Sequence, residues 1–440
     1  MQWRVLVLLW CVVLCLTAIP WPAHAQPELP PSPYCQQTRT TLEQLRCELA
    51  LALQGEDLDE IERPVALTID ELGVAQGVPE VPDRFDPISP DVPLLTAADV
   101  PHAFDAYADA IEANAWWTTF PDPTTIPRPL RAPADVVIGS LAARRAGAGD
   151  PDRLLAIARD AGEYLLWAQQ QGGCGVFPFP NWYGRTDRLG QVNTRFLDYA
   201  AAYGMRDEVL VNDWMVDDLG DGGLQFDNGL AGVAVLELYV ATGELRYLDS
   251  GLAAAEYALG ALVVPNWNYN SFSVYLLARA YRVTGDARYL EGAKLKARLG
   301  IYPGQLRTGA YAGRWADPHN ARLVYHYILI RGLGELVAAL PPDDPDLPLA
   351  VEVLTRALDA RNAEIAAQGA SHPATTLEVL SRLAIDLPPG DERLPDAGRG
   401  AALDVVGRYA TARYLRGEVN VGGVAAWGLY LEAVTAGAVT

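Results

Sequence analysis

Two short stretches decide the fold: Thr242-Gly243-Glu244-Leu245-Arg246-Tyr247-Leu248 and, about 42 residues later, Thr284-Gly285-Asp286-Ala287-Arg288-Tyr289-Leu290. Each joins an apolar helical segment to an amphipathic one. A weaker copy is Gly149-Asp150-Pro151-Asp152-Arg153-Leu154-Leu155. A helix pair that recurs at this spacing is typical of solenoids and toroids, because no single pair can bury its own apolar face.

Segments with an apolar period of 3.6 residues extend from this repeat in both directions, with almost no β-patterned runs between them. The predicted helices are approximately 134–146, 151–171, 190–203, 206–218, 229–241, 245–262, 271–283, 287–300, 320–340, 345–368, 373–385, 396–414 and 423–437. Those that begin near Gly229, Ser271, Ala321, Thr375 and Val424 are apolar on most faces, which predicts burial all round, whereas their partners are amphipathic. Inner and outer helices therefore alternate in the prediction.

This alternation, the connectors and the count of six hairpins plus a last inner helix resemble the (α/α)6 toroids of the six-hairpin glycosidase and polysaccharide lyase superfamily. The run Leu165-Leu166-Trp167-Ala168-Gln169-Gln170-Gln171-Gly172-Gly173 is similar to helix-ending runs in pectate-lyase-like members. The resemblance implies an all-α ring of six or seven hairpins over residues 131–440. It implies chemistry less narrowly, because the fold also serves epimerases, terpene cyclases and prenyltransferase subunits.

The N-terminal residues 1–25 have the pattern of a signal peptide. Arg4 precedes an apolar run of about a dozen residues, and Ala23-His24-Ala25 is a small-x-small cleavage pattern. That run is shorter than the roughly 20 residues that a membrane-spanning helix needs. We therefore expect cleavage after Ala25 and a secreted or periplasmic protein whose mature chain does not insert into a membrane.

Residues 26–130 contain many prolines, which remove backbone donors and disfavour the helical conformation of the preceding residue. This region is predicted to be an extended arm with short helices at about 38–54 and 102–114. The net charge of −21 disfavours nucleic acid as a partner. Beyond the signal peptide, Cys35, Cys47 and Cys174 are too few for a disulfide framework and lack metal-ligand spacing, and no metal or cofactor is predicted.

Four outer-to-inner connectors, over residues 177–185, 221–228, 266–270 and 311–320, are long and rich in aromatic, amide and charged residues. All four lead into inner helices, so they are expected to converge at one mouth of the ring. Aromatic faces stack on sugar rings, and amides and arginines pair with sugar hydroxyls; the alternative is that the tryptophans plug the end of the ring. The predicted substrate-binding residues are Trp182, Tyr183, Arg185, Gln225, Trp267, Asn268, Tyr269, Tyr311, Arg314, Trp315 and Arg322.

The candidate catalytic residues are two carboxylates and two histidines. Asp227 and Asp317 fall at predicted N-termini of inner helices, and glycoside hydrolysis needs two acids across a cleft; the alternative is simple helix capping. His319 and His326, seven residues apart on one helix face with Arg322 between them, could instead perform proton abstraction beside a uronate carboxylate. The alternative for the histidines is a hydrogen-bonded core position.

These observations predict an exported protein that acts on an oligo- or polysaccharide at the mouth of a helical ring. A glycoside hydrolase is favoured. A uronate-type polysaccharide lyase or epimerase, and a non-catalytic glycan-binding or scaffolding toroid, remain as alternatives.

Overall fold

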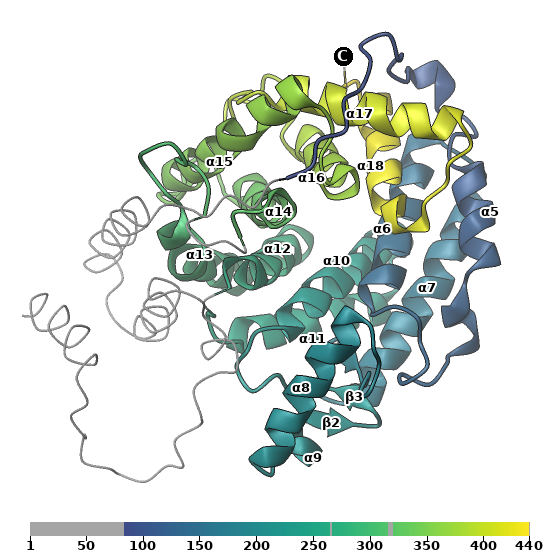
Figure 1. The fold of residues 1–440 in the computed structure, drawn as a ribbon, viewed down its shortest axis with the longest axis vertical. Coiled ribbons are helices and arrows are strands. Elements are labelled where there is room, and N and C mark those ends of the chain that lie inside the picture. Colours follow the sequence, from purple (N-terminus) through teal and green to yellow (C-terminus); the bar gives the residue numbers. More distant parts are fainter. Residues whose placement is uncertain (1–82, 265, 316–319, 440) are drawn as a thin grey trace, which may run out of the picture. The chain divides into compact units, whose positions relative to one another are not determined.

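The structure is a computed structural model that describes residues 83–264, 266–315 and 320–439. The chain divides into two units, residues 1–32 and 33–440, and every described residue belongs to the second unit. Helices dominate it, so the prediction of an all-α toroid is confirmed (Figure 1). Within the described ranges, no helix combines the length and apolar character that a membrane span requires.

Six of the described helices form a closed ring in which each contacts the next, and the last, α18, contacts the first, α6. These inner helices are α6 (Arg131–Ala146), α10 (Leu224–Thr242), α12 (Trp267–Thr284), α14 (Leu323–Ala339), α16 (Pro373–Asp386) and α18 (Val424–Thr435). Five outer helices follow their inner partners along the chain: α7 (Pro151–Gly172), α11 (Leu245–Gly260), α13 (Ala287–Gly300), α15 (Leu347–Gln368) and α17 (Arg399–Leu415). The predicted alternation of inner and outer helices is therefore confirmed.

The repeated connector forms the same structure at both of its strong copies. Gly243 and Gly285 end the inner helices with φ of 71° and 73°, a left-handed conformation that suits glycine. The tyrosine of each copy then donates a hydrogen bond to the preceding outer helix, Tyr247 to Glu163 over 2.7 Å and Tyr289 to Glu256 over 2.8 Å. The repeat thus ties each outer helix to its neighbour.

Helix α5 (Asp105–Ala113) completes the outer layer next to α18. Tyr107 stacks on Trp427 of α18 with ring centroids 6.0 Å apart, and the Trp427 indole donates a hydrogen bond to the Ala103 carbonyl over 2.9 Å. This helix agrees with the one predicted over 102–114. The helix predicted over 38–54 lies outside the described residues.

The ring closes where α6 and α18 meet backbone to backbone. A Cβ added at Gly428 would lie 2.1 Å from the carbonyl oxygen of Gly139, a distance that neither backbone can accommodate without moving. We expect Gly428→Ala to destabilise the protein by about 1–3 kcal/mol, measured by denaturant unfolding. Gly260→Ala at the end of α11 is the control, because among the described residues a Cβ there meets nothing within 4 Å, and its stability should be unchanged or slightly higher.

The second predicted hairpin, over 190–203 and 206–218, is not part of the ring. Its first half is α8 (Arg188–Ala202), but the second helix ends early as α9 (Arg206–Val209). The chain then turns at Asn212 and Asp213, with φ of 50° and 60°, into a small sheet of order β1-β3-β2. Its strands are β1 (Phe179–Pro180), β2 (Leu210–Val211) and β3 (Trp214–Met215), so residues 173–223 are an insertion between α7 and α10.

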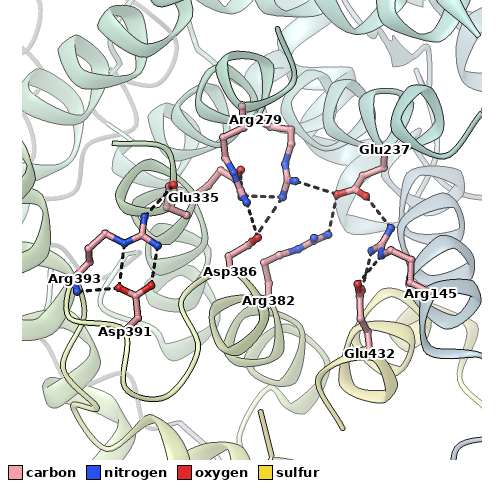
Figure 2. A network of polar contacts seen from close by, with 11 residues as sticks. Arg145, Glu237, Arg279, Glu335, Arg382, Asp386, Asp391, Arg393 and Glu432 are labelled. Carbon is pink, nitrogen blue, oxygen red and sulfur yellow. Dashed lines mark hydrogen bonds and ion pairs between the residues drawn. The ribbon is translucent and has the colours of Figure 1, made fainter. Parts of the chain in front are cut away.

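The C-terminal halves of the six inner helices are joined by buried ion pairs that we call the ionic plate (Figure 2). Glu237 lies 3.0 Å from Arg145, 3.4 Å from Arg279 and 3.3 Å from Arg382. Of the other pairs, Arg145–Glu432 and Arg279–Glu335 link neighbouring helices, and Arg282–Asp386 links α12 to α16. The full set is Arg145 (α6), Glu237 (α10), Arg279 and Arg282 (α12), Glu335 (α14), Arg382 and Asp386 (α16) and Glu432 (α18). With four arginines and four acids, the plate is electrically balanced.

Candidate functional site

Asp227 lies in the first turn of α10, at the end of the ring opposite the ionic plate. Its Oδ1 accepts a hydrogen bond from the backbone N–H of Arg131 over 3.1 Å and lies 3.4 Å from the Nε of the same residue. Burial raises the pKa of Asp227, while the Arg131 charge and hydrogen bonds lower it. Burial is the largest of these effects, so the pKa of Asp227 is raised overall, and Arg131 is its ion-pair partner.

Asp135 lies one turn after Arg131 on α6, so both side chains project from the same side of that helix. Burial raises the pKa of Asp135 to about 8, with the Glu378 and Asp227 carboxylates acting in the same direction. Its side chain nevertheless keeps partial exposure to solvent. These effects favour the protonated form of Asp135, and the residue is partly exposed.

Two stacked phenylalanines lie between the two arginines of this region. The rings of Phe226 (α10) and Phe272 (α12) are 4.2 Å apart and nearly parallel. The Arg131 guanidinium lies 4.0 Å from the Phe226 centroid, and that of Arg331 lies 5.7 Å from Phe272. Cations over aromatic faces are attracted by the ring quadrupole, so the stack fixes both arginines.

Arg331 on α14 pairs in turn with Glu378 on α16, with Nη2 and Oε2 2.8 Å apart. Both side chains are about nine-tenths buried. The charges of Asp227 and Glu378 both act on Asp135, and those of Arg131 and Arg331 oppose them. We call the three acids the axial acid cluster.

Tyr269, in the first turn of α12, belongs to the same region and is half-buried. Burial and the nearby Asp221 and Tyr325 raise the pKa of its hydroxyl, while Arg131 lowers it. Tyr325 is covered by the Arg322 guanidinium at 4.6 Å. Of the predicted site residues, the structure thus places Asp227, Tyr269 and Arg322 around the mouth of the ring.

The three predicted ligand-stacking tryptophans are packed inside the protein. Trp182, Trp267 and Trp315 are each 2% exposed or less. Trp315 donates its indole N–H to the Ile301 carbonyl over 2.9 Å, and Trp182 is covered by the Arg185 guanidinium at 3.9 Å. This burial favours the alternative interpretation, in which the tryptophans plug the end of the ring.

Two predicted amide residues are also engaged with the protein. Gln225 accepts a hydrogen bond from the Ser273 hydroxyl over 2.6 Å and donates to the Leu262 carbonyl over 3.2 Å. The Asn268 amide donates to Asn320 over 2.9 Å. Both side chains are almost fully buried and brace the start of the inner helices.

The remaining predicted binding residues are spread away from the axial acid cluster. Tyr183 and Arg185 belong to the insertion, where they bond Asp198 and Asp187 respectively. Arg314 pairs with Glu364 of the outer helix α15 and lies 5.3 Å from the Tyr311 ring. Asp317 and His319 lie outside the described residues, and their predicted roles stay predictions.

His326 is a core histidine between α14 and α15. Its Nε2 is hydrogen-bonded to the Ala357 carbonyl over 2.8 Å, and its side chain is fully buried against Trp315. Burial lowers the pKa of His326 to about 3. This position matches the alternative reading of a hydrogen-bonded core histidine, because a neutral buried imidazole does not exchange protons with substrate at neutral pH.

The low pKa of His326 predicts a loss of stability in acid. The unfolded chain binds a proton at this residue below about pH 6.5, whereas the folded chain does so only near pH 3. Each pH unit between these values therefore costs about 1.4 kcal/mol of folding free energy from this residue. We expect the imidazole carbon resonance of His326 not to titrate between pH 7 and 4.5, and a shift with a midpoint near 6.5 would contradict its burial.

A cleft of about 370 Å³ lies beside the start of α10, between the loop over 216–222 and the end of α11. Gln225, Tyr257 and Asp218 line it. The Asp218 carboxylate accepts backbone hydrogen bonds from Gly220 and Leu224 over 3.1 and 2.9 Å, so it shapes the loop. The lining of this cleft contains no member of the axial acid cluster. Among the described residues, no group of three or more His, Cys, Asp or Glu side chains could hold a metal ion.

Comparison with known proteins leaves the family open. No family model and no curated protein matches the chain. Among solved structures, the chain is similar to a polysaccharide lyase with 14% sequence identity and a TM-score of 0.43; the match covers 76% of this chain and 97% of that one.

Proposed function

We propose that the protein is an exported glycoside hydrolase whose catalytic acids are Asp135 and Asp227, at the mouth of the helical ring. The observation that carries the proposal is the pair itself. Burial raises the pKa of Asp135, which favours its protonated form, and Asp227, on the adjacent inner helix, is paired with Arg131. Glycoside hydrolysis needs such a pair, one acid to protonate the leaving oxygen and one carboxylate to act as base or nucleophile.

The residues around Asp135 and Asp227 are consistent with one acting as the acid and the other as the base or nucleophile. Asp135 is partly exposed, so an incoming glycosidic oxygen can reach its proton. The half-buried ring of Tyr269 lies at the same end of the inner helices and can stack on a sugar. The ionic plate occupies the other end of the inner helices, which supports entry of substrate from the Asp135 side.

A uronate lyase is the second candidate, supported by Tyr269 beside Arg131 and by Arg322 over Tyr325. In that reaction an arginine neutralises the uronate carboxylate while a tyrosine or histidine moves the proton. The raised pKa of Tyr269 keeps its hydroxyl protonated at neutral pH, so little phenolate is present to abstract a proton, which places this candidate second.

The test is to incubate the purified mature protein with a panel of neutral and uronate oligosaccharides while following two signals. New reducing ends without absorbance from an unsaturated product support the hydrolase. Reducing ends with that absorbance support the lyase. Binding without turnover on every member of the panel would leave a glycan-binding ring and would contradict both enzymatic proposals.

A further inference from the structure

A second cleft, of about 390 Å³, lies on the insertion, between the connector before α8 and α8 itself. We call it the insertion cleft. The residues that line it are Gly184, Arg185, Thr186, Gln191, Thr194 and Arg195. Apart from the glycine, every lining side chain is polar and none is acidic. The volume falls within the roughly 300–1,000 Å³ of small-molecule sites.

Arg195 gives the insertion cleft a positive charge that the protein does not compensate. Among the described residues, its guanidinium has no hydrogen-bond or ion-pair partner. Asp198, the acid that follows it on α8, instead accepts a hydrogen bond from the Tyr183 hydroxyl over 2.9 Å. A guanidinium carries five N–H donors in a planar fork, which matches the oxygens of a carboxylate or a tetrahedral oxyanion.

Arg185 is a second cation in the lining, and the protein holds it in place. Its Nε donates a hydrogen bond to Asp187 over 2.8 Å, and its Nη1 donates to the Ile126 carbonyl over 3.0 Å. Asp187 balances the charge of Arg185, so the excess positive charge of the cleft is that of Arg195. The two contacts do not use the Nη2 group of Arg185, which can donate to a ligand.

The uncharged side chains of the cleft add further donors. The Thr194 hydroxyl accepts a hydrogen bond from the Gly184 N–H over 2.8 Å, so its own proton remains for donation. The Gln191 amide donates to the Thr186 carbonyl over 2.7 Å, which fixes the adjoining wall. A cleft with an excess of donors and of positive charge requires a ligand that brings acceptors and negative charge.

The charge of the chain limits the size of that ligand. Residues 183–197 contain three arginines and one acid, whereas the whole chain has a net charge of −21. Beyond this local patch the protein repels polyanions such as nucleic acid. The cleft therefore suits a single acidic group on a small or otherwise neutral ligand.

Two observations favour a sugar as the carrier of the acidic group. Tyr183, next to Gly184 in the lining, is 47% exposed and adds an aromatic ring beside the cleft. The contact of Arg185 with Ile126 joins the cleft to the loop that leads into Arg131 at the mouth of the ring. A glycan bound at the mouth has this cleft on the adjoining surface of the protein.

We propose that the insertion cleft binds an acidic substituent, a carboxylate or a sulfate ester, carried by a sugar residue. Arg195 pairs with the oxyanion, and Arg185 and Thr194 donate further hydrogen bonds to it. The site contains no member of the axial acid cluster, so it goes beyond the catalytic proposal. Binding to it is measured without turnover, and the result does not depend on which reaction the mouth performs.

The test is a titration of the mature protein with glucuronic acid, galactose 6-sulfate and glucose at constant ionic strength. The NMR signals of the Gly184 amide and the Arg195 Nε–H are followed. We expect both signals to shift with the two acidic sugars and not with glucose. A failure of both acidic sugars to shift these signals would overturn the proposal.

Variants of Arg195 identify the group that binds. Arg195→Gln should weaken binding of the acidic sugars about tenfold, because a charge-assisted pair is lost. Arg195→Lys keeps the charge and should lose less. Arg416→Gln is the matched control, since it removes the same charge from a side chain that is 58% exposed on another part of the surface. Equal weakening in Arg195→Gln and Arg416→Gln would show a general effect of charge and would overturn the site.

Inorganic sulfate distinguishes a sugar site from a site for free anions. We expect sulfate alone to bind more weakly than galactose 6-sulfate, because it makes no contact through a sugar ring. Binding of inorganic sulfate as tight as that of galactose 6-sulfate would assign the cleft to free oxyanions and refute the sugar ligand. Thermal unfolding of Arg195→Gln should match that of the wild type, because Arg195 is exposed.

Discussion

Asp135→Asn is expected to reduce turnover by about 10²–10⁴-fold on whichever glycan the panel identifies, with little change in folding. The amide cannot donate the proton that the leaving oxygen needs, although its shape is almost the same. The comparison is made on kcat from reducing-end assays with the wild-type protein at pH 7. Asp359→Asn on the exposed side of α15 is the matched control, and its kcat should equal that of the wild type.

Two further measurements separate an acid from a merely structural residue. Because Asp135 must be protonated to act, wild-type activity should fall as the pH rises through about 8, the pKa of this group. An aryl glycoside with a good leaving group needs little proton donation, so Asp135→Asn should retain much more activity on it. Loss of activity to the same degree on both substrates would assign Asp135 a different role.

The ring could be predicted from the sequence because its repeat is local. Gly243 and Gly285 occupy left-handed positions at the ends of inner helices, and the following Arg-Tyr pair contacts the neighbouring outer helix. Such signals depend only on residues a few positions apart. The prediction of a helix over 206–218 was wrong beyond Val209, where β2 and β3 follow. Apolar periodicity cannot distinguish a strand from a helix in segments as short as these two strands.

Much of the candidate site could not be predicted, because its members meet only when the ring closes. Asp135 and Glu378 lie on α6 and α16, which are far apart in sequence and on either side of α18. A signal was nevertheless present. Glu378 and Arg331 interrupt helices that are otherwise apolar on most faces, and a charge in such a helix must be paired or face water. The tryptophan-rich connectors carry the more conspicuous sequence pattern, but their indoles are buried.

Glu237→Gln is expected to destabilise the protein by about 3–5 kcal/mol, as measured by denaturant unfolding. Glu237 lies within 3.4 Å of three arginines, Arg145, Arg279 and Arg382, and is itself 5% exposed. These charges hold the pKa of Glu237 well below its usual range despite burial. The neutral amide would remove the acidic partner of Arg382 and leave the ionic plate with one excess positive charge.

Glu256→Gln provides the matched control, because Glu256 pairs with Arg288 at the surface with half of its side chain exposed. Its loss should cost at most about 1 kcal/mol. The pH dependence gives a second criterion. A carboxylate with a lowered pKa stabilises the fold above its unfolded pKa near 4.5, and this stabilisation decreases as the pH falls below that value. Glu237→Gln should therefore lose less stability below pH 4.5 than the wild type does. If Glu237→Gln were as stable as Glu256→Gln and lost as much stability below pH 4.5 as the wild type, the ionic plate would not contribute to holding the inner helices together.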